Sequence, residues 1–322
     1  MSPMKTSFLF ASLLAWSCMG REWPGPYEAG SPAHQQPAGP ELVTAEWLKQ
    51  HLADPNQIIY HVSMERLNYD AGHVPGAVFA PLGEFHNHMA ADKLPEPAAI
   101  AAALGRLGLS NGARVVLVGD PMSTAILFVA LDYVGHGGKT AVLDGGLGAW
   151  RNAGGSVSKE AVSAKPVTFV PNVRTDMVVD AAWIKENLGS KRVALFDVRT
   201  RSEYDGTANE RLPRKGHIPG AKFVPWMATF DPRDVEHDAS GAIMDIAPES
   251  ARLQPRAKLE RLYTSNGAQR DGIVVSYCTV GMRASHSYFV SRLLGYPARI
   301  YVGSMADWTR NAENPVVGLS KP

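Results

Sequence analysis

The most informative part of this chain is the stretch IVVSYCTVGMRAS, residues 273–285. A short β-branched run that ends at Cys278 and continues into a helical pattern predicts a buried strand, a tight loop and then a helix. The loop would place a thiol at a helix N-terminus, where unpaired backbone N–H groups and the helix dipole favour a negative charge. Gly281 permits a tight backbone path, and Arg283 adds a fixed positive charge. We therefore predict that Cys278 is a reactive thiolate nucleophile, with a buried structural cysteine as the alternative.

Three motifs in this half of the chain resemble those of rhodanese-like sulfurtransferases. The first is DVR at 197–199, followed by Glu203-Tyr204 and by GHIPGA at 216–221. The second is the Cys278 loop, which resembles the active-site loop of that family. The third is GSMADW at 303–308, a variant of the closing Gly-Gly-x-x-x-Trp signature. The resemblance implies a thiosulfate or 3-mercaptopyruvate sulfurtransferase of the tandem-domain type, which commonly carries its active cysteine in the second half.

The chain also repeats itself. GHVPGA at 72–77 matches GHIPGA at 216–221, and DGGLGAW at 144–150 matches the segment around GSMADW. In each half, apolar strands alternate with helical patterns, which predicts a parallel sheet flanked by helices. We therefore expect an α/β fold of two rhodanese-like domains, residues 41–158 and residues 174–318.

The two halves differ where chemistry would occur. Aligning VVLVGD at 115–120 with IVVSYC at 273–278 sets Asp120 against Cys278, and an aspartate cannot carry sulfane sulfur. The first half also has HVS at 61–63 where the second has DVR. We therefore predict that the first domain is catalytically silent and the second catalytic. A silent copy can still form a wall of the active cleft, because pockets favour domain interfaces.

The resemblance implies roles for the residues around Cys278. Its thiolate would attack the outer sulfur of a small-molecule donor and hold a persulfide, which a thiol, a thiol protein or cyanide then accepts. Backbone N–H groups of the loop would cradle the charged sulfur, and the arginines would bind the anionic donor. The predicted substrate-binding residues are Arg199, Thr279, Val280, Gly281, Met282 and Arg283. Asp197 is expected to orient the loop or Arg199, with a strand-end residue that caps nearby backbone as the alternative, and His217 is expected to stabilise a turn.

Two other functions stay open on the sequence alone. A Cys-dependent phosphatase of the same fold would have one more residue between its cysteine and arginine, whereas four residues separate Cys278 from Arg283 here. A redox-sensing or binding module would use Cys278 only as an oxidisable thiol. Among sulfur donors we expect thiosulfate, because the site keeps cations but little else that is selective. The alternative donor is 3-mercaptopyruvate.

Composition limits the partners. The chain has 322 residues, of which 45% are hydrophobic and 20% charged, as in soluble globular proteins. A net charge of +1 and the lack of a basic run argue against nucleic-acid binding. No run approaches the ~18 consecutive apolar residues of a membrane-spanning helix, so no span is expected after processing.

The N-terminus has the features of a targeting segment. Lys5 precedes a short apolar run at 8–16, which predicts a signal-like segment over residues 1–20 and export to the periplasm. A lipid anchor at Cys18 is a weaker alternative, and without a signal the chain would be cytoplasmic. Residues 21–40 are rich in Pro, Gly and Ser and predict a flexible linker. The chain has only two cysteines, so Cys278 is left alone if Cys18 is removed or lipidated.

One polar stretch raises the question of a metal. It contains Asp231, Asp234, Glu236, His237 and Asp238, and such side chains can ligate metal ions. They lack a recognisable ligand spacing, so we interpret the stretch as a solvated loop. We expect neither a metal nor a cofactor.

Overall fold

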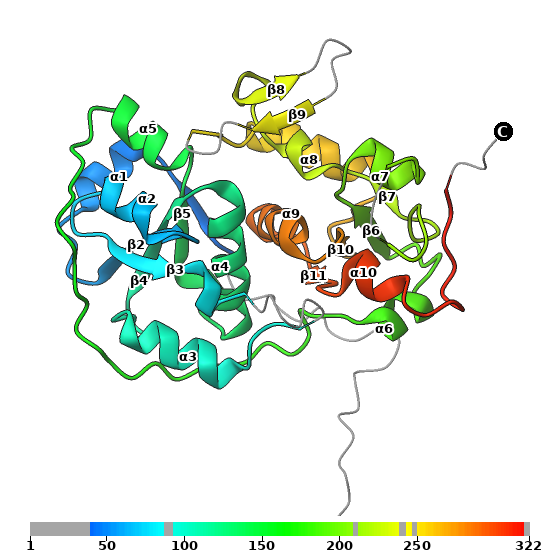
Figure 1. Cartoon of the computed structure of the whole chain (residues 1–322), viewed down its shortest axis with the longest axis horizontal. Coiled ribbons are helices and arrows are strands. Elements are labelled where there is room, and N and C mark those ends of the chain that lie inside the picture. The colour runs from blue at the N-terminus through cyan, green and yellow to red at the C-terminus, as the bar shows by residue number, and fades with distance from the viewer. Residues whose placement is uncertain (1–38, 87–92, 209–211, 238–242, 247–249, 319–322) are drawn as a thin grey trace, which may run out of the picture.

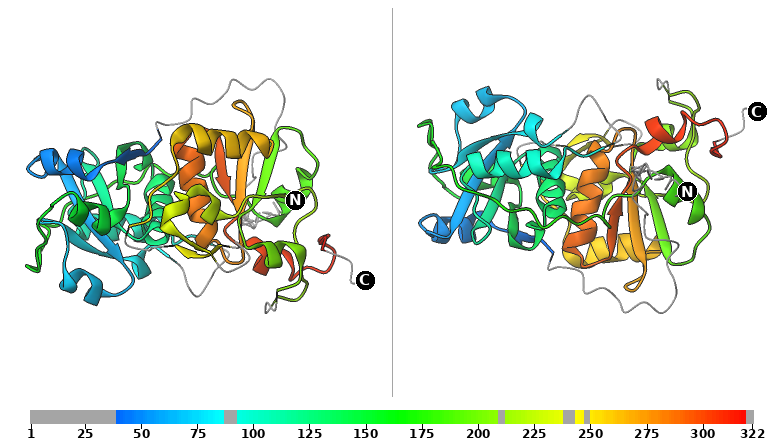
Figure 2. Two further views of the ribbon diagram at one scale, coloured as in Figure 1. Left: turned by 90° about the horizontal axis from the view of Figure 1, so that it is seen from above. Right: turned by 90° about the horizontal axis from the view of Figure 1, so that it is seen from below.

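The computed structural model describes residues 39–86, 93–208, 212–237, 243–246 and 250–318. The predicted signal-like segment and almost all of the predicted linker lie outside the described residues, as does Asp238. Within the described ranges, no helix is long and apolar enough to cross a membrane. The chain forms two halves that lie end to end (Figure 1; Figure 2).

The first half is built on a parallel sheet of five strands in the order β1-β5-β4-β2-β3. Its strands are β1 (Glu41–Val43), β2 (Gln57–Ser63), β3 (Val78–Pro81), β4 (Arg114–Gly119) and β5 (Thr140–Leu143). Its α-helices are α1 (Ala45–His51), α2 (Arg66–Ala71), α3 (Pro97–Arg106), α4 (Pro121–Tyr133) and α5 (Gly146–Asn152). Apolar cores lie on both faces of this sheet, one against α1 and α5 and the other against α3 and α4.

The second half repeats this plan with a parallel sheet of four strands in the order β11-β10-β6-β7. Its strands are β6 (Val193–Asp197), β7 (Lys222–Phe223), β10 (Ile273–Tyr277) and β11 (Ala298–Ile300). Its α-helices are α6 (Ala181–Glu186), α7 (Arg201–Asp205), α8 (Arg256–Ser265), α9 (Met282–Leu293) and α10 (Ser304–Trp308). An antiparallel hairpin, β8 (Val235–His237) and β9 (Ile243–Ile246), projects from this half (Figure 1). Two parallel sheets flanked by helices confirm the expected α/β class.

The turn that carries the GH(V/I)PGA motif is the same in both halves. The ring of His73 stacks on Tyr69 with centroids 3.7 Å apart, and its Nδ1 donates to the Tyr69 carbonyl at 2.9 Å. His217 stacks on Tyr204 at 3.6 Å, and its Nδ1 donates to the Tyr204 carbonyl at 2.8 Å. A histidine that repeats this geometry in the half without the active cysteine has a structural role, as expected for His217.

Helices α4 and α9 pack against each other between the two sheets and join the halves (Figure 1). The join includes a buried charge network centred on Asp132 of α4, which is 1% exposed. Its Oδ2 accepts hydrogen bonds from Tyr288 Oη at 2.6 Å and from Arg292 Nε at 2.9 Å, both on α9. Arg174 Nη1, from the segment between the halves, donates to the same oxygen at 2.7 Å. The first half therefore holds the helix that follows the Cys278 loop.

The sheet registers correct the sequence alignment between the halves. His61 of β2 pairs with Val118 of β4, and Asp197, its counterpart in β6, pairs with Tyr277 of β10. Val118 therefore matches Tyr277. In agreement, each of these side chains packs in a core that contains only residues of its own half.

The residue of the first half that matches Cys278 is therefore Gly119, and the prediction of Asp120 at that place is wrong by one residue. Asp120 matches Thr279 instead. A one-residue slip moves every side chain of a strand to the opposite face. Strands covered on both faces are apolar throughout, so the pattern of VVLV and IVVS did not reveal the slip.

Candidate active site

Cys278 follows β10 directly and begins the short loop that leads into α9. Its side chain is buried, and the backbone N–H of Gly281 donates to Cys278 Sγ at 3.1 Å. Gly281 has φ of 88°, and a Cβ there would lie 2.8 Å from the Val302 carbonyl oxygen. Only glycine fits both constraints. The sulfur thus lies at the N-terminus of a helix, where the dipole and an N–H donor favour a negative charge, as predicted.

The start of α10 forms hydrogen bonds with the backbone of the Cys278 loop. Ser304 Oγ accepts the N–H of Cys278 at 3.0 Å. The N–H groups of Met305 and Ala306 donate to the carbonyls of Cys278 and Thr279 at 3.1 and 3.0 Å. These two carbonyls therefore face α10. In a trans peptide the following N–H points the opposite way, so the N–H groups of Thr279 and Val280 face away from α10.

Arg283 is bound to Glu203 of α7 by a two-pronged ion pair. Nη1 donates to Oε2 at 2.6 Å and Nη2 donates to Oε1 at 2.6 Å, with the two side chains 21% and 12% exposed. Arg283 Nη2 also donates to Thr279 Oγ1 at 2.8 Å, and Thr279 Oγ1 donates to Glu203 Oε1 at 3.1 Å. The guanidinium therefore ties both ends of the Cys278 loop to α7. It holds the loop, whereas its predicted contact with a donor stays a prediction.

Glu203 was missing from the predicted site. Thr200 and Glu203 form a capping box at the start of α7, a local pattern that the sequence does contain. The partnership with Arg283, 80 residues away, has no sequence signal. Burial would raise the pKa of Glu203, but the hydrogen bonds and charge of Arg283 outweigh it, together with the hydrogen bonds from Thr200, and lower the pKa to about 2.

Arg199 and Asp197 form a fully buried ion pair beneath the loop. Arg199 Nε donates to Asp197 Oδ1 at 3.0 Å and Nη2 donates to Oδ2 at 2.7 Å, with both side chains 0% exposed. Arg199 Nη2 also donates to the Gly216 carbonyl at 2.6 Å. Asp197 Oδ1 also accepts the backbone N–H of Arg199 at 3.1 Å, so Asp197 both pairs with the guanidinium and caps the strand end, and its supporting role at the site stays a prediction. The Arg199 guanidinium has no exposed surface in this structure, and its predicted donor-binding role stays a prediction.

The matching loop of the first half is shorter and closed. A Cβ on Gly119 would lie 2.4 Å from the Val62 carbonyl oxygen, so no side chain fits at the nucleophile position. Helix α4 begins two residues after Gly119, whereas α9 begins four residues after Cys278. Asp120 caps α4, and its Oδ1 accepts the N–H groups of Met122 and Ser123 at 3.0 and 2.9 Å. The Asp120 carboxylate therefore accepts the N–H groups that a charged sulfur at this place would need.

The first half also lacks the buried ion pair. His61 and Ser63 stand where the second half has Asp197 and Arg199. Burial, together with the charges of neighbouring His73 and Arg151, lowers the pKa of His61 to about 4. The imidazole is therefore neutral at pH 7.

Both halves contribute to a cavity beside the Cys278 loop. On the second-half side it is lined by Val280, Gly281 and Ser285. The residues of the first half that line it are Phe85, His86, Lys93, Leu94, Ile126 and Val129. The first half therefore forms one wall of the cavity beside the Cys278 loop.

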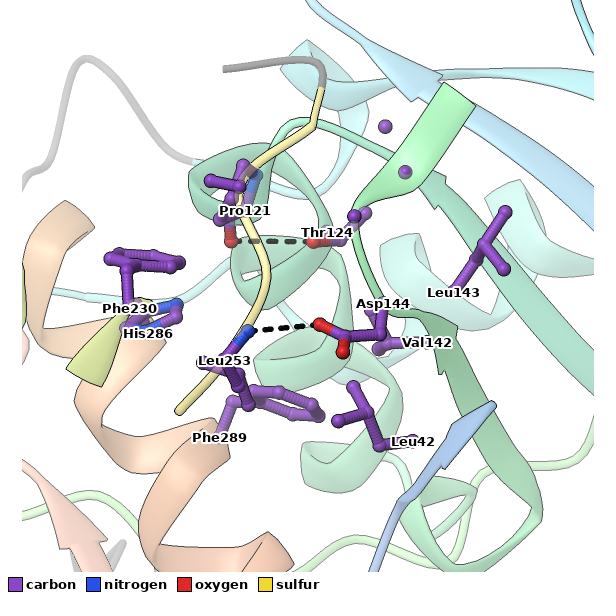
Figure 3. Close-up of a pocket in the computed structure, with 14 residues that line it drawn as sticks. Leu42, Pro121, Thr124, Val142, Leu143, Asp144, Phe230, Leu253, His286 and Phe289 are labelled. Atoms are coloured by element: carbon purple, nitrogen blue, oxygen red, sulfur yellow. Dashed lines mark hydrogen bonds between the residues drawn. The ribbon is translucent and has the colours of Figure 1, made fainter. Parts of the chain in front are cut away.

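A second cavity also takes its lining from both halves, with Gly119 and Thr124 from the first and Leu253, His286 and Phe289 from the second (Figure 3). Figure 3 shows Asp144 beside Leu253, whose N–H donates to Asp144 Oδ1 at 2.9 Å. Burial raises the pKa of Asp144 to about 6, although this N–H and the charge of Arg252 oppose the rise. Gly119, which matches Cys278 in the sheet register, lines this cavity and supplies no thiol to it.

The stretch considered for a metal is held by ion pairs. Asp231 pairs with Arg233, and Asp234 pairs with Arg252. Among the residues that the structure describes, no group of three His, Cys, Asp or Glu side chains is placed to hold a metal ion.

Comparison with known proteins agrees with this geometry. The rhodanese-like domain family matches residues 44–153 and 180–311, one stretch in each half. The chain is 32% identical over 292 residues to sulfur carrier protein TtuD of Thermus thermophilus, covering 84% of this chain and 94% of that protein. It is 31% identical over 306 residues to a thiosulfate sulfurtransferase of Corynebacterium glutamicum, covering 88% and 93%. It is 29% identical over 321 residues to thiosulfate/3-mercaptopyruvate sulfurtransferase 2 of Arabidopsis thaliana, covering 87% of each.

Solved structures show the same fold. A structure of EanB with a cysteine persulfide and ergothioneine has a TM-score of 0.71 at 25% identity, covering 87% of this chain and 71% of that chain. The anaerobic ergothioneine biosynthesis enzyme from Chlorobium limicola has a TM-score of 0.70 at 23% identity, with the same coverage. The chain therefore belongs to the rhodanese family, as a tandem-domain sulfurtransferase of the thiosulfate/3-mercaptopyruvate type.

Proposed function

We propose that this protein moves sulfane sulfur from thiosulfate to a thiol or to cyanide through a persulfide on Cys278. The observation that carries the proposal is the position of Cys278 Sγ, 3.1 Å from the Gly281 N–H at the start of α9. That position stabilises a charged sulfur before and after transfer. The ion pair between Arg283 and Glu203 keeps the loop in this shape.

The chemistry proceeds in two balanced steps. The Cys278 thiolate attacks the outer sulfur of thiosulfate, a new S–S bond forms on Cys278, and sulfite leaves with the electron pair of the broken S–S bond. The acceptor, a thiolate or cyanide, then attacks the outer sulfur of the persulfide. The bond between the two sulfurs of the persulfide breaks and the Cys278 thiolate is restored. No proton or external electron is needed when the acceptor attacks as an anion.

The pairing of Arg283 supports sulfur transfer over phosphate-ester hydrolysis. Both terminal nitrogens of the guanidinium are engaged by Glu203, which balances its charge. A phosphatase arginine must offer these nitrogens to two phosphate oxygens. The loop with four residues between Cys278 and Arg283 agrees with this preference.

Steady-state kinetics with three substrates test the proposal. We expect thiocyanate formation from thiosulfate and cyanide, a lower kcat/KM with 3-mercaptopyruvate, and no phosphate release from p-nitrophenyl phosphate. Cys278→Ser should abolish sulfur transfer, because a serine hydroxyl is far less acidic than a thiol. Phosphate release that depends on Cys278 would contradict the function, and a higher kcat/KM for 3-mercaptopyruvate would contradict only the choice of donor.

We also propose that the protein is exported. The support is the sequence alone, Lys5 followed by the apolar run at 8–16. Cell fractionation of the full chain and of a variant lacking residues 1–20 tests this: only the full chain should reach the periplasm. Equal distribution of the two would contradict export.

A further inference from the structure

Ser304 has a strained backbone. Its φ is 52°, and among the described residues it is the only non-glycine residue with a positive φ. Left-handed backbone is unfavourable for a side chain with a Cβ, and such strain persists where the surrounding structure or the function requires it. The positive φ of Ser304 therefore needs an explanation from the contacts of this residue.

The first half provides the matched case. Gly146 precedes Trp150 by four residues, as Ser304 precedes Trp308, and its φ is 51°. The same backbone turn thus occurs in both halves, and the silent half fills it with the residue that fits without strain. The catalytic half has a serine in its place.

The serine hydroxyl both donates and accepts a hydrogen bond, and one of its partners is the backbone amide of Cys278. Ser304 Oγ accepts the backbone N–H of Cys278 at 3.0 Å and donates to the Tyr301 carbonyl at 2.9 Å. Ser304 is 0% exposed and Cys278 is 1% exposed, so this N–H has no access to water in the structure. A glycine would leave it without this partner, and a buried unpaired N–H is destabilising.

The position of this bond links it to the sulfur. The Cys278 amide is the junction between the rigid strand β10 and the loop. Together with the bonds from Met305 and Ala306, the hydroxyl fixes three successive peptide groups, from the one that joins Tyr277 to Cys278 to the one that follows Thr279. Their orientation determines where Gly281 lies, and the Gly281 N–H reaches Cys278 Sγ at 3.1 Å. Releasing the Cys278 amide would therefore loosen the donor that stabilises the charged sulfur.

We propose that Ser304 is a positioning residue for Cys278, whose hydroxyl holds the nucleophile's own amide and thereby keeps the loop N–H groups directed at the sulfur. The backbone strain is retained because the catalytic half needs the hydroxyl and the silent half does not. This inference rests on the proposed role of Cys278 as the sulfur-carrying nucleophile.

Two substitutions separate the hydroxyl from the strain. Ser304→Gly removes the hydroxyl and relieves the strain, whereas Ser304→Ala removes the hydroxyl and keeps the strain. In the first half, Gly146→Ala adds the same strain at the matching turn and serves as the control. For each variant of the full chain we would measure the melting temperature, the pH dependence of Cys278 alkylation by iodoacetamide, and kcat and KM for thiosulfate.

We expect both Ser304 variants to lose about tenfold or more in kcat, the scale of effect that misplaced reacting groups produce. Their alkylation midpoint should move to higher pH, because the thiolate loses a donor. Ser304→Gly should melt at a higher temperature than Ser304→Ala, and Gly146→Ala should melt lower than the unaltered protein while keeping its kcat and alkylation midpoint.

Unchanged kcat and alkylation midpoint in both Ser304 variants would overturn the inference and leave Ser304 with a purely structural role. Alkylation reports on the thiol without any sulfur donor. A shifted midpoint in a protein that transfers no sulfur would therefore support the positioning role while contradicting the proposed function.

Discussion

The two halves of this molecule share a common arrangement of strands and helices but differ in the loop that leads from strand β4 or β10 into the following helix. In the first half, Asp120 turns its own carboxylate onto the N–H groups at the start of α4, at 3.0 and 2.9 Å. In the second half, the start of α9 is left to the sulfur of Cys278, with Gly281 as donor at 3.1 Å. In the first half the Asp120 carboxylate therefore occupies the anion site at the helix N-terminus. In the second half the longer loop leaves that site to the sulfur.

The difference extends beneath the loop. The catalytic half supports its loop with two charge pairs, Arg199 with Asp197 and Arg283 with Glu203. In the silent half, Ser63 stands at the place of Arg199 and accepts a hydrogen bond from Asn68 Nδ2 at 2.9 Å. Charge pairs thus support the longer loop at Cys278, and a neutral hydrogen bond is found beside the shorter loop at Gly119.

Removing Arg199 should have the largest effect on stability. Arg199→Ala leaves Asp197 as a buried charge without its main partner, which typically costs about 3–5 kcal/mol. The matched change Ser63→Ala should cost far less. Chemical denaturation would measure both free energies of unfolding. Because Arg199 has no exposed surface, we expect KM for thiosulfate to change less than kcat in any folded Arg199 variant, such as Arg199→Lys; a rise in KM alone would instead indicate donor binding.

Glu203→Gln should have an intermediate effect that depends on pH. The pKa of Glu203 falls from an ordinary 4.5 to about 2 on folding, so its stabilisation is complete above pH 4.5 and is lost as pH falls toward 2. At pH 7 we expect a loss on the order of 3 kcal/mol, the size that such a shift implies, and a lower kcat because the loop loses its ion pair with α7.

The control for Glu203 is Asn68→Ala, because Asn68 precedes Tyr69 as Glu203 precedes Tyr204. This control should leave kcat unchanged. Denaturation curves at several pH values would show the difference between Glu203→Gln and the unaltered protein shrinking below pH 4.5. If the difference in free energy of unfolding stays constant down to pH 2, the ion pair between Glu203 and Arg283 is not its cause.

Asp120→Ala should have the smallest effect. The loss of an N-cap side chain costs about 1 kcal/mol, so the melting temperature should fall slightly. Thiosulfate:cyanide activity should stay the same, because the Asp120 side chain hydrogen-bonds to the start of α4 in the first half. A loss of activity as complete as that of Cys278→Ser would show that the first half takes part in the chemistry.

Much of this organisation could be predicted from the sequence, because it depends on local patterns. The strand, loop and helix around Cys278 follow from a β-branched run, a glycine and a helical pattern, and the repeat from matching motifs. The exact match of Gly119 to Cys278 could not be predicted, because strands buried on both faces show no alternation that fixes the register.

The supporting contacts escaped prediction for a different reason. Glu203 and Arg283 are distant in the sequence, and only the folded chain brings them together. The strain at Ser304 is a property of its backbone and gives no signal in the residue itself. The burial of Arg199 could not be predicted either, because the motif DVR indicates which residue is important but not whether its side chain faces a ligand or the core.

The intact mass of the protein after thiosulfate treatment tests the division between the halves most directly. The unaltered protein should gain the mass of one sulfur atom, located on Cys278 by peptide mapping, and should lose it on addition of cyanide. Cys278→Ser should gain none, and neither should Cys278→Ser combined with Gly119→Cys, because a Cβ on Gly119 would lie 2.4 Å from the Val62 carbonyl oxygen. A persulfide on the introduced thiol of that double variant, or sulfur bound by Cys278→Ser, would contradict the assignment of the chemistry to the second half alone.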